Sequence, residues 1–186
     1  MDRVDLPGQS DDISLLKSAQ AGNAEAFGAL YERYAPAVFR YLAAHLSSGL
    51  DAEDLTTDVF LRAWQSLPNY HERGVPFLAF LLRIARNAVI DQYRRNRSGQ
   101  SYPTDLEPTL EDEAPGPAES LVQQLERQEM AQVLARLNED YRTVLVLRFI
   151  NGLSPQETAQ VMKRSAGAVR VLQHRALSAL RRLLEL

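Results

Sequence analysis

The sequence of 186 residues contains no cysteine and only three histidines. Without cysteine there is no disulfide framework, no thiolate zinc site and no cysteine nucleophile. His45, His71 and His174 are scattered along the chain and do not indicate a cluster of metal ligands. The sequence also lacks a nucleophile–base pair and a phosphate-binding glycine loop, so we expect no enzymatic activity, no metal and no cofactor.

Long apolar runs and a secretory signal are missing as well. The longest apolar run, residues 75–82, ends at Arg83, whereas a membrane span needs roughly 18 apolar residues. The first 12 residues contain four aspartates, where a secretory signal has a basic start and an apolar core. The composition is ordinary for a soluble protein, with 45% hydrophobic and 24% charged residues. We therefore expect a cytoplasmic protein without membrane insertion.

The net charge of −3 is distributed unevenly. Residues 83–97 contain five arginines and one aspartate, and residues 163–182 contain six basic residues and no acid. Between these basic patches, residues 101–120 contain six acids and no base. Two basic patches are compatible with nucleic-acid binding even though the whole chain is acidic.

Proline, glycine and acidic residues separate two helical segments. Residues 98–118 contain prolines, glycines and most of the acidic run, a composition that predicts a flexible linker. Residues 13–97 and 119–186 show helical periodicity, and no alternating strand pattern is visible. The sequence therefore predicts an all-α protein with two small helical domains joined by an acidic, proline-rich, flexible linker.

Four helices are predicted in the first domain. Asp12 is expected to cap a helix over residues 13–21, and Asn23 is expected to cap the next, in which Pro36 would introduce a kink or a break. Asp51 is expected to cap a third helix, which ends before Pro68. A long fourth helix is expected over residues 77–95.

The second domain has the layout of a helix-turn-helix. Asn138 can cap a helix that ends at residues 151–152, an Asn-Gly pair suited to a left-handed stop. Residues 154–157, Ser-Pro-Gln-Glu, form a capping box with proline at the first helical position. That helix is short, and Ser165 can cap a longer basic helix after it.

The last helix carries side chains that suit the major groove of DNA. Arg170 could form two hydrogen bonds with guanine and Gln173 with adenine. The small residues at 165–168 would let the backbone approach a phosphate, and basic residues such as Arg175 would contact phosphates too. The alternative is a solvated basic helix at the edge of a domain.

The helix expected over residues 77–95 combines arginines with nearby aromatic residues, among them Tyr70 and Tyr93. Such a surface suits a separated DNA strand, in which a flipped base stacks on a ring. Core aromatics with solvated arginines would explain the pattern equally well.

An acidic group, residues 51–58, occupies the third helix. Asp54 and Asp58 are four residues apart and repel each other mildly, and a basic protein partner would relieve that repulsion. Asp51 and Glu53 also suit a helix start, so a solvated face remains an alternative.

Several motifs, in order along nearly the whole chain after about residue 13, resemble the extracytoplasmic-function sigma factors. Residues 51–55 and 58–64, DAEDL and DVFLRAW, resemble the polymerase-binding helix of region 2.2. Residues 83–87, RIARN, with Asp91 and the arginines at 94–95, resemble regions 2.3 and 2.4. Leu147-Arg148-Phe149 and residues 152–159 resemble region 4, and residues 167–176 resemble its −35 recognition helix.

The resemblance implies a transcription initiation factor that binds core RNA polymerase and promoter DNA. The implied polymerase-binding residues are Asp51, Glu53, Asp54, Asp58 and Arg62. The implied −10 DNA residues are Tyr70, His71, Arg83, Arg86, Asn87, Asp91, Arg94 and Arg95. The implied −35 DNA residues are Lys163, Arg164, Ser165, Gly167, Ala168, Arg170, Gln173, His174 and Arg175.

Further partners follow from the same resemblance. The acidic face would meet the β′ clamp helices of the polymerase, the apolar side of the second domain would meet the β flap, and the linker would thread the RNA exit channel. An anti-sigma factor would cover both DNA-binding faces. Thr57, Phe80 and Gln173 differ from the side chains common in the family.

One alternative of a different class remains on the sequence alone. An autonomous helix-turn-helix regulator would bind an operator as a dimer, with the first domain sensing a signal. It would bind duplex DNA tightly without polymerase, whereas a sigma factor would need core polymerase.

Overall fold

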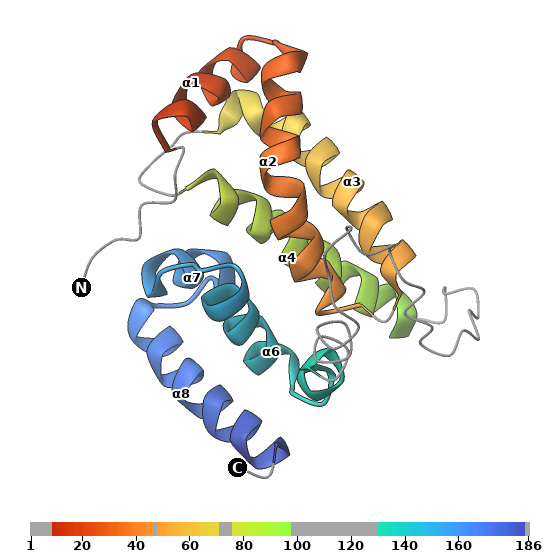
Figure 1. Ribbon diagram of the computed structural model, residues 1–186, viewed down its shortest axis with the longest axis vertical. Coiled ribbons are helices and arrows are strands. Elements are labelled where there is room, and N and C mark those ends of the chain that lie inside the picture. Colours follow the sequence, from red (N-terminus) through yellow and green to blue (C-terminus); the bar gives the residue numbers. More distant parts are fainter. Residues whose placement is uncertain (1–8, 47, 71–75, 98–129, 185–186) are drawn as a thin grey trace, which may run out of the picture.

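The computed structural model describes residues 9–46, 48–70, 76–97 and 130–184. Within these ranges all regular structure is helical (Figure 1), which confirms the predicted all-α fold. The elements are α1 (Gln9–Gln20), α2 (Ala24–Ala43), α3 (Gly49–Ser66), the 3-10 turn η1 (Leu67–Asn69), α4 (Phe77–Arg97), α6 (Glu139–Leu145), the π-helical turn η2 (Val146–Ile150), α7 (Pro155–Met162) and α8 (Ala166–Leu183). Residues 130–135 are also helical. The predicted linker, residues 98–118, lies outside the described residues.

Helices α1 to α4 pack together as the first half of the molecule (Figure 1) and share an apolar core. Leu30, Val38 and Leu42 of α2 are fully buried, as are Val59 of α3 and Leu81 of α4. Each helix contributes an apolar stripe at helical spacing, and burial of these stripes stabilises helices that would be marginal in isolation.

Of the three helix caps predicted in this half, one is confirmed and two are wrong, while α4 begins at residue 77 as predicted. Asn23 caps α2 by accepting a hydrogen bond from the Ala26 N–H at 3.1 Å. The cap of α3 is Ser48, so Asp51 lies inside the first turn. Aspartate is favourable both at a cap and in the first turn, so the sequence does not distinguish the two positions.

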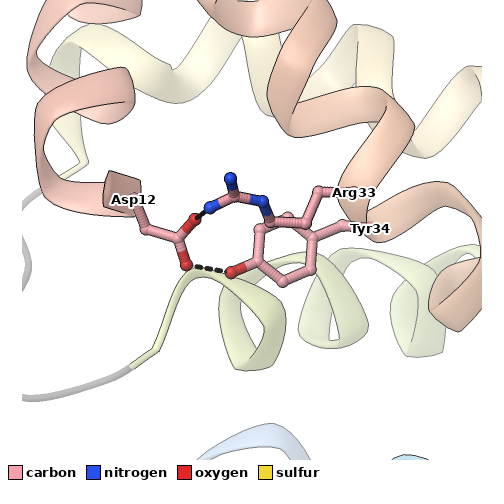
Figure 2. Close-up of polar contacts among 3 residues, drawn as sticks. All are labelled: Asp12, Arg33 and Tyr34. Atoms are coloured by element: carbon pink, nitrogen blue, oxygen red, sulfur yellow. Dashed lines mark hydrogen bonds and ion pairs between the residues drawn. The ribbon is translucent and has the colours of Figure 1, made fainter. Parts of the chain in front are cut away.

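Asp12 also lies inside a helix, because α1 begins at Gln9. Its buried carboxylate accepts hydrogen bonds from Arg33 and Tyr34 of α2 (Figure 2). The residue predicted to cap α1 therefore joins α1 to α2.

Helix α2 does not break at Pro36, which is exposed. Proline removes one N–H donor from the helix. The turns on either side are held by buried Leu30 and Val38, so tertiary packing outweighs the local preference of proline.

The second half follows the predicted capping pattern closely. The side chains of Asn138 and Ser165 cap α6 and α8. Gly152 has φ +70°, the left-handed conformation expected at the stop after η2. Ser154 and Glu157 make both hydrogen bonds of the capping box at the start of α7. These predictions are confirmed because each depends on contacts within four residues.

The two halves pack directly against each other. Helix α7 lies between α4 and α8, and η2 contacts α2 (Figure 1). His45 Nε2 lies 3.0 Å from Thr143 Oγ1, and the Asn151 side-chain amide donates to the Ala37 carbonyl at 2.9 Å. These buried bonds join positions 98 and 114 residues apart. The tertiary structure thus adds an interface to the two-part arrangement predicted from the sequence.

Candidate nucleic-acid interface

The acidic side chains of α3 face solvent. Asp51, Glu53 and Asp54 are exposed, and none has an ion-pair partner among the described residues. Asp58 is half-buried and pairs with Arg62 one turn later at 2.9 Å. That pair is exposed to solvent and contributes at most about 1 kcal/mol. Within the described residues the face therefore keeps a net negative charge, as a site for a basic partner requires.

Basic and polar residues line one face of α4. Arg83, Asn87, Asp91 and Arg94 are all exposed and follow one another at intervals of three or four residues, which places them on one side of a helix. Arg95 is exposed beside them and bonds Gln92 of the same helix at 2.9 Å. The guanidinium of Arg83 lies 5.6 Å from the ring centroid of Phe80, a distance suited to a cation–π contact.

Arg86 differs from its neighbours on α4. It is only partly exposed, and its Nε is buried without a hydrogen-bond partner in the structure. Its charge acts on both Tyr41 and His45, at the boundary with the second half. The residue predicted to bind −10 DNA thus borders the interface between the halves in this conformation.

Tyr70 is buried rather than displayed to a base. Its ring lies 4.7 Å from that of Phe80 and 5.7 Å from that of Phe77, measured between centroids. Its carbonyl accepts a hydrogen bond from the Gln20 amide at 2.6 Å. Any stacking on a flipped base requires the ring to leave this aromatic cluster. His71 lies outside the described residues.

The first residues of α8 have small, exposed side chains, and basic residues lie beside them. Ser165, Gly167, Ala168 and Arg170 are all exposed. A Cβ built on Gly167 would meet only Ser165 Oγ, at 4.0 Å, so internal packing does not require glycine there. The open space leaves room for a phosphate or a base edge to approach the helix.

Among the remaining −35 residues, some side chains are exposed and one forms an ion pair with another helix. Lys163 is exposed at the C-cap of α7 in the left-handed region, with φ 54°. His174 and Arg175 are exposed on α8. Arg164 is exposed but pairs with Asp140 at 2.6 Å.

Gln173 is held by a residue that the sequence did not single out as its partner. The Arg148 Nε donates to the Gln173 side-chain oxygen at 2.9 Å, and another nitrogen of Arg148 donates to the Leu153 carbonyl. Burial lowers the pKa of Arg148, while Glu157 opposes that shift. Arg148 belongs to the region 4 motif, but no spacing rule connects it to a residue 25 positions later.

His45 is the other side chain that the sequence did not mark. It is 3% exposed between the halves, and its Nδ1 lies 2.8 Å from the Tyr41 carbonyl. Burial lowers its pKa to about 4, the charges of Arg142 and Arg86 act in the same direction, and the Tyr41 bond opposes them. His45 is therefore neutral near pH 7.

Comparison with known proteins identifies the family. Sigma-70 region 2 matches residues 30–99, and Sigma-70, region 4, matches residues 127–180. The chain is 36% identical over 172 residues to the ECF RNA polymerase sigma factor SigD of Mycobacterium tuberculosis, a match that covers 90% of this chain and 81% of that relative. The chain belongs to the extracytoplasmic-function (ECF) sigma factors. This sigma factor is also 37% identical to the ECF RNA polymerase sigma factor BldN of Streptomyces coelicolor, over 92% of this chain and 65% of that longer relative.

Solved structures resemble the sigma factor across both halves. One is the structure of CnrH in complex with the cytosolic domain of CnrY, with a TM-score of 0.73, 30% identity and coverage of 95% of this chain and 98% of CnrH. Another is RpoE in complex with the anti-sigma factor NepR from Bartonella quintana, with a TM-score of 0.72, 25% identity and coverage of 88% and 99%.

Family membership confirms the predicted function. The sigma factor is a transcription initiation factor that binds core RNA polymerase and directs it to specific promoters. The autonomous helix-turn-helix regulator is not supported. Within the described ranges, no helix is both long and apolar enough to span a bilayer.

Proposed function

We propose that three surfaces of this sigma factor divide the work of initiation. The acidic face of α3 binds the β′ clamp helices of core polymerase, the arginine-bearing face of α4 binds and melts the −10 element, and the start of α8 reads the −35 element. The observation that carries the proposal is the charge arrangement. An exposed acidic face on α3 and exposed basic faces on α4 and α8 belong to separate helices.

The two halves take different tasks in this proposal. Residues 13–97 act as the region 2 domain, residues 98–118 as an acidic tether that threads the RNA exit channel, and residues 119–186 as the region 4 domain. Phe149 and Ile150 of η2 are 59% and 40% exposed, which supports an apolar contact between the second domain and the β flap.

The sigma factor makes or breaks no covalent bond in this scheme. Its surfaces bind and orient, and the polymerase supplies the chemistry. It acts in the cytoplasm, where polymerase and promoter DNA are present.

Reconstituted transcription tests the proposal. The purified chain is mixed with bacterial core polymerase on a promoter library, start sites are mapped, and DNA binding is followed by mobility shift. We expect promoter-specific transcripts only when the chain and core are both present, and no tight duplex binding by the chain alone. Failure to associate with core, or a complex that opens no promoter, contradicts the proposal.

The packed arrangement of the halves also suits an inhibited form held by an anti-sigma factor. Two solved relatives that resemble this chain, CnrH and RpoE, are each bound to another protein. Their coverage of nearly the whole chain supports a similar placement of both halves here. We expect the sigma factor isolated from its source cells to carry a protein that core polymerase displaces. Isolation without any bound protein contradicts this part of the proposal.

A further inference from the structure

Helix α1 precedes the segment that matches Sigma-70 region 2, which begins at residue 30. It nevertheless packs against η1, the turn that leads to Tyr70. Leu16 and Ala19 bury one side of α1 in the core. The helix is therefore a fixed support beside a residue with a proposed role in −10 recognition.

Gln20, the last residue of α1, bonds the backbone of the first residue of η1 and of the residue that follows η1. Its side-chain amide donates to the Leu67 carbonyl at 3.1 Å and to the Tyr70 carbonyl at 2.6 Å. An amide group has two N–H donors, so one side chain bonds both carbonyls. The Leu67 carbonyl also accepts the Tyr70 N–H at 3.0 Å, so Gln20 reinforces a turn that is already hydrogen-bonded. Both contacts of Gln20 are partly buried, where the loss of a hydrogen bond is costly.

Asp12 of the same helix supports the Tyr70 ring by a second route. Its carboxylate accepts the Tyr34 hydroxyl (Figure 2), and the Tyr34 ring lies edge-on to Phe77 at 5.7 Å. Phe77 in turn lies edge-on to Tyr70 at 5.7 Å. Burial and the bond to Asp12 raise the pKa of Tyr34, so its hydroxyl keeps the proton that it donates.

We propose that Gln20 is a positioning residue for −10 recognition and acts through Tyr70. The inference rests on the proposed function, together with the −10 role that the family resemblance implies for Tyr70. The bonds that Gln20 makes in the described part of the chain go to main-chain carbonyls, so they hold the Tyr70 backbone in place without fixing its side-chain torsions. A backbone held before DNA arrives loses less conformational entropy when the base is captured.

The test uses the full chain assembled with core polymerase. Gln20→Leu removes both donors and keeps the volume, and Gln20→Glu keeps the shape but replaces the donors with acceptors. A fluorescent base in the −10 element reports open complexes. We expect both variants to form roughly five- to tenfold fewer open complexes, the effect of losing about 1 kcal/mol of hydrogen bonding, with unchanged affinity for core. Gln132→Leu, at an exposed glutamine of the second half, is the matched control and should match wild type.

A double-mutant cycle with Tyr70→Ala separates positioning from general support of the fold. If Gln20 acts through Tyr70, Gln20→Leu causes no further loss in the Tyr70→Ala background. An equal loss in both backgrounds, or open-complex formation by Gln20→Leu at the wild-type level, overturns the inference. Thermal unfolding shows whether each variant folds. If Gln20→Leu does not fold, the cycle is run with Gln20→Glu. Wild-type holoenzyme that opens no promoter would instead overturn the proposed function itself.

Discussion

At the scale of single residues, the least expected side chain is His45, an uncharged histidine buried between two basic groups. Arg86 approaches it from α4 and Arg142 from α6, and Tyr41 and Tyr93 supply neutral contacts. In the unfolded chain its pKa is 6.5, and in the packed structure it is about 4. Between these values the unfolded chain binds more protons, so stability rises with pH.

The first prediction concerns the pH dependence of that stability. The contribution of His45 is fully present above pH 6.5 and is lost as pH falls towards 4, a loss of up to about 3 kcal/mol. We expect the free energy of unfolding, measured in urea, to fall more steeply in wild type than in His45→Gln over this range. His174→Gln, at an exposed histidine, should keep the wild-type slope. Equal slopes for wild type and His45→Gln would show that His45 does not titrate as described.

The second prediction concerns Arg170, an exposed residue in the first turns of α8. If Arg170 bonds a base edge, Arg170→Ala should weaken the free energy of promoter binding by about 1–3 kcal/mol. The variant should also lose its preference for one base at a single upstream position. Transcription from a library randomised at the −35 element measures this effect. Arg182→Ala, in the last turn of α8, should leave base preference unchanged. An unaltered preference in Arg170→Ala refutes the assignment.

At the scale of elements, the acidic side chains of α3 are exposed to solvent, so a substitution among them should leave the buried core of the helix unchanged. Asp54→Arg should lower affinity for core polymerase roughly three- to tenfold, because repulsion of about 1 kcal/mol replaces attraction at an exposed site. Binding to labelled core measures the change, and circular dichroism checks the fold. Glu32→Arg, at an exposed acid of α2, is the control. Wild-type affinity of the Asp54→Arg variant would show that the acidic face of α3 does not bind core polymerase.

Two glycines around α2 should respond in opposite directions to the same change. Gly28 lies inside the helix, where an added Cβ would meet nothing within 4 Å, whereas Gly22 has φ +94°. Gly28→Ala should raise the free energy of unfolding by about 0.5–1 kcal/mol, since alanine loses less backbone entropy in a helix. Gly22→Ala should lower the same quantity by about 1 kcal/mol, since a side chain strains that backbone. Urea unfolding measures the free energy of unfolding of both variants. A change in the same direction in both would contradict this account of the two glycines.

At the scale of the whole molecule, the direct contact between the halves is the main feature. Reading two promoter segments while docked on polymerase requires the halves to be placed by the polymerase and the DNA. In this structure the buried bonds of Thr143 and Asn151 hold the halves together. If polymerase and promoter require a different placement of the halves, core binding competes with the packed form.

The last prediction weakens that packed form. Thr143→Val and Asn151→Ala together remove two buried interface bonds, worth about 0.5–1.5 kcal/mol each. With dyes on α3 and α8, we expect lower energy transfer in the free double variant than in wild type. Thr57→Val, at an exposed threonine, is the control. Unchanged transfer in the double variant would show that these bonds do not hold the halves together.

The sequence by itself determined the helices, most of their ends and the family. Asn23, Asn138, Ser154 and Ser165 bond groups within four residues, so local chemistry specifies them. The charged faces of α3, α4 and α8 also follow from helical spacing, and their exposure agrees with it.

Only the tertiary structure decided which of these side chains are engaged. Asp12, Gln20 and His45 meet partners 21 to 98 residues away, and Tyr70 and Gln173 are held by residues of other elements. No periodicity or capping rule encodes such pairs, because they depend on how whole helices pack. Burial between packed helices is also what makes His45 neutral and withdraws part of Arg86 from solvent.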